Sequence, residues 1–125
     1  MKRKYCKAYF VIKGKSNHDK IIEEIGVLPD KTIVNDDYFE LHYGYTEKYD
    51  DISWENISDV LYLVIKQLIG KDSLLASLKT KYNLKFDLPI DTNALDLSEV
   101  LVLDGKVTTF LHWSNTREDL SWYYF

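Results

Sequence analysis

The 125-residue chain is poor in the residues that several large classes of protein require. It has one cysteine, Cys6, so it cannot form an internal disulfide bond, which is typical of proteins that work in a reducing cytoplasm. Its three histidines are scattered and no zinc-finger spacing is present. We therefore expect a cytoplasmic protein with no metal site and no cofactor.

Long apolar runs are also missing. The longest, Val60–Ile65, is far shorter than the ~20 residues that cross a bilayer. The basic start Met1–Lys4 resembles that of a signal peptide, but Lys7 interrupts the apolar stretch that follows. We predict no cleaved signal and no membrane association. The five glycines are isolated, so the sequence holds no glycine-rich phosphate loop.

The periodicity of the apolar residues predicts a single α+β domain over residues 1–125. There is no internal repeat and no Ser/Gly/Pro-rich linker. Alternation predicts strands at 5–12, 32–34, 38–45, 84–90 and 120–125, and helical spacing predicts helices at about 17–25, 53–69, 73–82 and 105–114. A polar loop is expected over residues 46–51. This order favours one antiparallel or mixed sheet with helices on one face.

Local signals give more specific expectations. Cys6, Ala8, Phe10 and Ile12 fall on one side of the first strand, with Tyr5, Lys7, Tyr9 and Val11 on the other. Ser16 is placed to cap the first helix, and Gly26 to end it in a left-handed conformation. Asp72 or Ser73 is expected to cap the third helix, whose Leu74 would face inward. Pro89 indicates an edge strand or a point where pairing stops.

Several segments together resemble a known group of proteins. These are the opening strand Ala8-Tyr-Phe-Val-Ile12, the helix end Ile25-Gly-Val-Leu-Pro29, and the later segments Lys79–Phe86 and Leu103–Leu111. The combination resembles a bacterial family of small proteins of unknown function. The resemblance implies a ferredoxin-like fold and supplies no catalytic residues. Ser121-Trp122-Tyr123 departs from the acidic–aromatic pair expected in the last strand.

The modest net charge of −4 conceals two opposed blocks. The first fifteen residues hold six basic residues and no acidic one, whereas residues 36–59 hold eight acidic residues against Lys48 alone. Tyrosines are interleaved with the acidic block. Aromatic side chains anchor protein interfaces and charges steer association, so the segment Asp36–Asp59 is a candidate protein-binding surface. An alternative is that the opposed blocks pair on adjacent strands and that the aromatic residues fill the core.

We therefore predict a non-enzymatic protein-interaction module that contacts a basic partner, such as an immunity protein that neutralises a toxin. Binding of nucleic acid is disfavoured by the sequence pI of about 5.3. The residues predicted to contact the partner are Tyr43, Tyr45, Glu47, Tyr49, Asp50, Asp51, Trp54 and Glu55.

Two other functions remain open. Tyr38, Glu40 and His42 share one side of a strand and could bind a small ligand or move a proton, in a pocket between sheet and helices. The ordinary interpretation of such a row is a solvated outer face. No nucleophile–base pair is found, because Cys6 lies on the apolar side of its strand. A homodimer through a Tyr-rich face or an edge strand is the third possibility.

Overall fold

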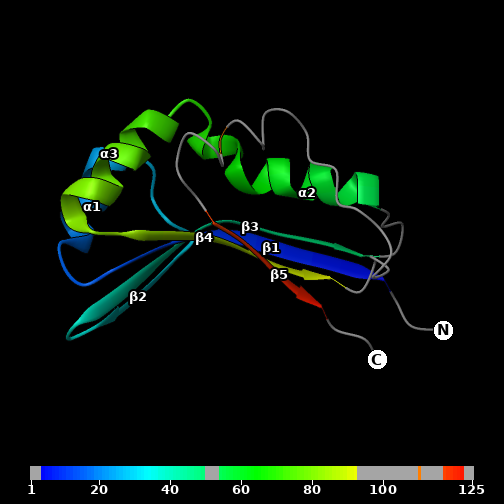
Figure 1. The fold of residues 1–125 in the computed structure, drawn as a ribbon. Coiled ribbons are helices and arrows are strands. Elements are labelled where there is room, and N and C mark those ends of the chain that lie inside the picture. The colour runs from blue at the N-terminus through cyan, green and yellow to red at the C-terminus, as the bar shows by residue number, and fades with distance from the viewer. Residues whose placement is uncertain (1–3, 50–53, 93–109, 111–116, 123–125) are drawn as a thin grey trace.

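The protein is an open β-sheet with helices on one face (Figure 1). The structure, a computed structural model, describes residues 4–49, 54–92, 110 and 117–122. In chain order the elements are β1 (Tyr5–Gly14), α1 (His18–Ile25), β2 (Lys31–Asn35), β3 (Tyr38–Tyr49), α2 (Trp54–Ile65), the 3₁₀ turn η1 (Lys66–Leu68), α3 (Asp72–Tyr82), β4 (Lys85–Thr92) and β5 (Arg117–Trp122).

The five strands lie in the order β2-β3-β1-β4-β5. β1 pairs antiparallel with both β3 and β4, and β2 forms an antiparallel hairpin with β3. The last pairing, between β4 and β5, is parallel. The predicted α+β class, the mixed sheet and the coverage of one face by helices are confirmed.

The core lies between the sheet and the helices. The predicted inward side of β1 is confirmed, because Cys6, Ala8, Phe10 and Ile12 are all fully buried. The ring of Phe10 contacts those of Phe86 on β4 and Phe110 at centroid distances of 5.6 and 5.5 Å. Burying a side chain of this size contributes about 2–3 kcal/mol, so the aromatic centre beneath α2 is a major source of stability.

The helix ends agree with the sequence in part. Gly26 ends α1 in the left-handed conformation (φ 78°), and its N–H donates to the Ile22 carbonyl, as predicted. The expectation for Ser16 is wrong, because Asn17 precedes α1 and makes no side-chain cap. Lys71, rather than Asp72 or Ser73, precedes α3. Leu74 is 37% exposed, since the buried side of α3 is formed by Leu75 and Leu78.

β4 is an interior strand, so the prediction that Pro89 marks an edge is wrong. β4 pairs with β1 on one side and with β5 on the other. The β1–β4 register runs from Cys6↔Thr92 to Ala8↔Ile90 and resumes at Val11↔Asp87, leaving out Pro89. Because proline has no N–H to donate, the interruption at this residue follows from its chemistry.

The main departure from the sequence prediction is a β-bulge at Gly44. β3 continues to Tyr49 through the segment expected to be a loop. In its register with β1, Ala8 pairs with Thr46 but Phe10 pairs with Tyr43, so Gly44 and Tyr45 together lie opposite Tyr9. A bulge with a left-handed glycine at its first position has this form, and Gly44 has φ 67°.

The bulge inverts the alternation of β3. Before it, Phe39, Leu41 and Tyr43 are buried against the helices; after it, Tyr45, Glu47 and Tyr49 are exposed. The carboxylate of Asp30 accepts a hydrogen bond from the Tyr45 N–H at 3.0 Å, which satisfies a donor at the bulge. The bulge therefore decides which tyrosines belong to the core and which to the surface.

α2 crosses β3 and β1 directly above this point. A Cβ atom at residue 44 would overlap the backbone carbonyl of Val64, so only glycine permits the close approach of α2. In the described part of the chain, no helix is long and apolar enough to span a membrane.

We predict that Gly44→Ala destabilises the protein by at least about 3 kcal/mol, because it adds a clash with a helix backbone to the unfavourable φ. Gly70 is the matched control: it also has a positive φ (89°), but open space surrounds its Cβ position. Gly70→Ala should cost about 1 kcal/mol. Urea unfolding measures the free energy of unfolding of both variants. An equal decrease in the two would show that the α2 contact at Gly44 is unimportant.

Candidate functional site

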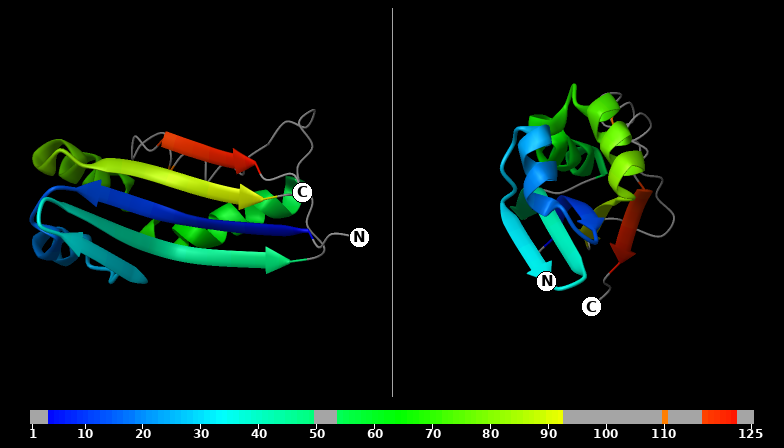
Figure 2. Two further views of the ribbon diagram at one scale, coloured as in Figure 1. Left: turned by 90° about the horizontal axis from the view of Figure 1, so that it is seen from below. Right: turned by 90° about the vertical axis from the view of Figure 1, so that its left-hand side faces the viewer.

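The candidate site is the face of the sheet opposite the helices, which we call the open face. Seen from that side, the strands lie in front and no helix of the described residues covers them (Figure 2, left). Tyr5, Lys7 and Tyr9 of β1 are partly exposed here, as predicted, and so is Lys13. Val11, which was predicted on the same side, is fully buried.

One end of the open face carries four tyrosines, which we call the tyrosine patch: Tyr5, Tyr9, Tyr45 and Tyr49. The rings of Tyr9 and Tyr45 lie 6.4 Å apart, and Tyr9 also stacks on His42 at 4.5 Å. The ammonium group of Lys7 lies 5.5 Å from the ring of Tyr5 and 5.9 Å from that of Tyr49. Neighbouring strands thus bring distant tyrosines into one cluster around a lysine.

Carboxylates hold the hydroxyl groups of the patch. Glu47 accepts hydrogen bonds from Tyr45 and, at 2.9 Å, from Tyr49. Asp91 of β4 accepts one from Tyr5 at 3.0 Å. The hydrogen bond to Glu47, together with partial burial, raises the pKa of Tyr45 to about 12, and the same bonds lower the pKa of Glu47. At neutral pH Tyr45 is therefore protonated beside an ionised Glu47.

The opposed charge blocks of the sequence come together in the sheet. Lys7 is directly opposite Glu47, and Lys13 is directly opposite Glu40. Lys13 also forms an ion pair with Asp87 of β4 at 3.3 Å. The alternative in which the blocks pair on adjacent strands is therefore realised on the open face. Because opposite charges neutralise one another there, the aromatic residues distinguish the surface more than its charge does.

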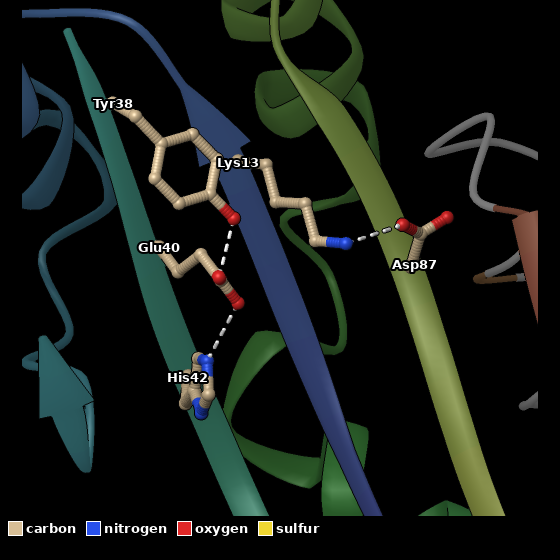
Figure 3. Close-up of polar contacts among 5 residues, drawn as sticks. All are labelled: Lys13, Tyr38, Glu40, His42 and Asp87. Carbon is tan, nitrogen blue, oxygen red and sulfur yellow. Dashed lines mark hydrogen bonds and ion pairs between the residues drawn. The ribbon is translucent and has the colours of Figure 1, made fainter. Parts of the chain in front are cut away.

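Tyr38, Glu40 and His42 form a connected row on β3 (Figure 3). Tyr38 donates to one oxygen of Glu40, and His42 Nε2 donates to the other at 3.0 Å. Burial would raise the pKa of Glu40, but these two hydrogen bonds and the charge of Lys13 outweigh it and hold that pKa below its usual value. Burial and the bond to Glu40 raise the pKa of Tyr38 to about 12. A carboxylate held ionised and a phenol held protonated are poorly suited to exchange a proton at neutral pH.

Of the residues predicted to bind a partner, three lie on the open face: Tyr45, 49% exposed, Tyr49, 37% exposed, and Glu47. Tyr43 does not. It is 1% exposed and its hydroxyl donates to the Val27 carbonyl at 2.9 Å, so it is a core residue that cannot contact a partner. Asp50 and Asp51 lie outside the described residues, and for Trp54 and Glu55 the structure describes only the backbone, in the first turn of α2.

Sequence reasoning missed Tyr5, Tyr9 and Asp91 as members of the site. The alternation of β1 already placed Tyr5 and Tyr9 on the side away from the core. The sequence does not show which strands pair, and it is the β1–β3 and β1–β4 registers that bring Tyr5 and Tyr9 beside Glu47 and Asp91.

A cleft of about 440 Å³ lies at the other end of the open face, where β1 ends and β3 and β4 begin. We call it the lysine cleft, after three of its lining residues. It is lined by Lys13, Lys15, Tyr38, Asn83, Lys85 and Asp87. The ligand pocket predicted beside Tyr38 was expected between the sheet and the helices. This cleft instead lies at the sheet end, since the inward side of the strands is filled by the core.

The described residues offer neither a clear metal site nor a reactive cysteine nucleophile. No group of three or more His, Cys, Asp or Glu side chains in these ranges is placed to hold a metal ion. Burial raises the pKa of the Cys6 thiol to about 11, which keeps it protonated and unreactive at neutral pH.

Comparison of the chain with protein-family models, curated proteins and solved structures finds no match. The resemblance to a bacterial family therefore stays a prediction.

We predict that Tyr38→Phe lowers the free energy of unfolding by about 1 kcal/mol at pH 7, because Glu40 loses a donor. The pKa of Glu40 is lower in the folded state than its usual 4.5, so this stabilisation is present above pH 4.5 and is lost as the pH falls through the folded value. Urea unfolding of both proteins should therefore give curves that differ at pH 7 and converge in acid.

The control is the same substitution in a Glu40→Gln background, in which residue 40 carries no titratable group. There the effect of Tyr38→Phe should not vary between pH 7 and acid. If the effect of Tyr38→Phe on the free energy of unfolding still varied with pH in this background, a group other than Glu40 would be responsible for the pH dependence.

Proposed function

We propose that this protein is a non-enzymatic interaction module that binds a basic protein partner through the tyrosine patch, as an immunity protein binds the toxin it neutralises. The observation that carries the proposal is the bulge at Gly44. It places Tyr45, Glu47 and Tyr49 on the open face beside Tyr5 and Tyr9.

The rigidity of the patch supports this function. Tyrosine is enriched at protein interfaces because it offers a large apolar ring and a polar tip with few rotatable bonds. Here the hydroxyl groups of Tyr5, Tyr45 and Tyr49 are already hydrogen-bonded to carboxylates. Less side-chain entropy is then lost when a partner binds, which favours affinity.

The charge around the patch supports a basic partner. Among the described side chains of the patch, the two carboxylates of Glu47 and Asp91 accompany the single ammonium group of Lys7. Asp50 and Asp51 follow β3 directly in the sequence, and Glu55 belongs to the first turn of α2. An acidic sequence that continues from this strand would attract a basic surface.

The proposal extends to the fold. A β-α-β-β-α-β connection with four antiparallel strands in the order β4-β1-β3-β2 is the ferredoxin-like arrangement, to which β5 adds a parallel strand. We place the protein in the cytoplasm of a bacterium, consistent with its single, buried thiol.

We predict that the partner is the product of the reading frame next to this gene. Purified together, the two proteins should form a complex whose Kd rises at least about tenfold in Tyr45→Ala and again in Glu47→Lys, since aromatic anchors commonly carry more than about 2 kcal/mol of binding free energy. Titration calorimetry at two salt concentrations measures this, and the Glu47→Lys effect should shrink at high salt.

Matched controls lie on the helix side. Leu63→Ala removes an exposed apolar side chain from α2, and Glu23→Lys makes the same charge change on α1. Both should leave the Kd within about twofold. A complex that is insensitive to the patch variants would refute the assigned surface, and sedimentation showing a dimer lost in Tyr45→Ala would replace the partner by a second copy of this chain.

A further inference from the structure

We infer that the lysine cleft binds a phosphate group, as part of a small phosphorylated molecule. This site goes beyond the proposed protein interaction, since it lies at the opposite end of β1. Tyr5 and Lys13 are eight residues apart on one strand, which corresponds to roughly 25 Å.

The first observation is a pair of like charges in the sheet. Lys13 of β1 and Lys85 of β4 are direct cross-strand partners. Like charges in this position repel each other and destabilise a sheet. An anion held between the two ammonium groups would attract both and offset that repulsion. Lys15 follows one residue after the end of β1 and lines the same cleft.

The second observation is that the positive charge is only partly compensated. Lys13 is paired with Asp87 at 3.3 Å, which fixes its ammonium group across the cleft. No carboxylate of the described residues forms an ion pair with Lys15 or Lys85. Tyr38 donates a hydrogen bond to Glu40, so that nearby carboxylate is already engaged. Two lysines thus remain available to an anion.

Further polar groups surround the cleft. Asn83 ends α3 in the left-handed conformation (φ 55°), and its exposed side chain lines the cleft beside Lys85. A second depression of about 240 Å³ shares Lys85 and Asp87 and adds Lys79, so positive charge extends beyond the first cleft. An anion bound in the cleft would meet ammonium groups from the end of β1 and the start of β4, with the amide of Asn83 beside them.

The type of cation and the size of the cleft favour phosphate over carboxylate. Carboxylates are best matched by the planar fork of arginine, whereas lysine acts as a point charge and is a common phosphate ligand. Each charged residue of the cleft other than Asp87 is a lysine. A volume of about 440 Å³ falls in the range of small-molecule pockets and exceeds the space of a phosphate ion alone.

Titration calorimetry with inorganic pyrophosphate tests the inference. The wild-type protein should bind one equivalent of pyrophosphate. The double variant Lys15→Gln/Lys85→Gln should bind it with a Kd at least about tenfold higher, because two charge-assisted contacts are lost. Malonate, a dicarboxylate, should bind more weakly than pyrophosphate. Malonate binding as tight as pyrophosphate would overturn the assignment to phosphate.

The control is Lys66→Gln/Lys71→Gln, which makes the same change of net charge on η1 and at the start of α3. It should keep the wild-type Kd; an equal loss of affinity would show that only overall charge matters and would refute the site.

Without ligand, Lys85→Gln should not lower the Tm, since it relieves the repulsion with Lys13. Tyr45→Ala should bind pyrophosphate normally, which separates this inference from the proposed protein interaction.

Discussion

The close approach of α2 to the sheet at Gly44 is the constraint on which the surface of this protein depends. The backbone of Val64 occupies the space that a Cβ at residue 44 would need, and the glycine adopts a conformation that other residues avoid. The extra residue of the bulge then reverses the alternation of β3. As a result Tyr43 completes the core while Tyr45 and Tyr49 lie on the open face, so that one packing contact separates structural from candidate functional tyrosines.

The open face shows how a sheet can combine segregated sequences into a mixed surface. The basic start of the chain forms β1, and the acidic middle forms β3, which is its antiparallel neighbour. Lys7 therefore faces Glu47, and Lys13 faces Glu40. Because such pairs largely cancel, what remains among the described residues is local. Exposed tyrosines bound to Glu47 and Asp91 lie at one end, and Lys15 and Lys85, which form no ion pair with a described carboxylate, lie at the other. The two ends of the open face are therefore chemically different surfaces of one sheet.

Much of the framework could be predicted from local patterns. The alternation of Cys6, Ala8, Phe10 and Ile12 is a property of consecutive residues, and so is the left-handed helix end at Gly26. The extension of β3 to Tyr49 was not predicted, because its polar residues resemble a loop and their pairing with β1 is a long-range contact. Pro89 was misjudged for a similar reason: β5, far along the chain, makes β4 an interior strand.

The sequence by itself determined the class of fold, the inward side of β1 and the row Tyr38, Glu40 and His42, since period-two patterning needs no knowledge of neighbours. Only the tertiary structure decided which tyrosines are exposed, which charges are neutralised, and that Lys13 and Lys85 face each other. These features depend on strand register and on the position of α2 above Gly44. Both are set by contacts between residues far apart in the chain, which no local pattern encodes.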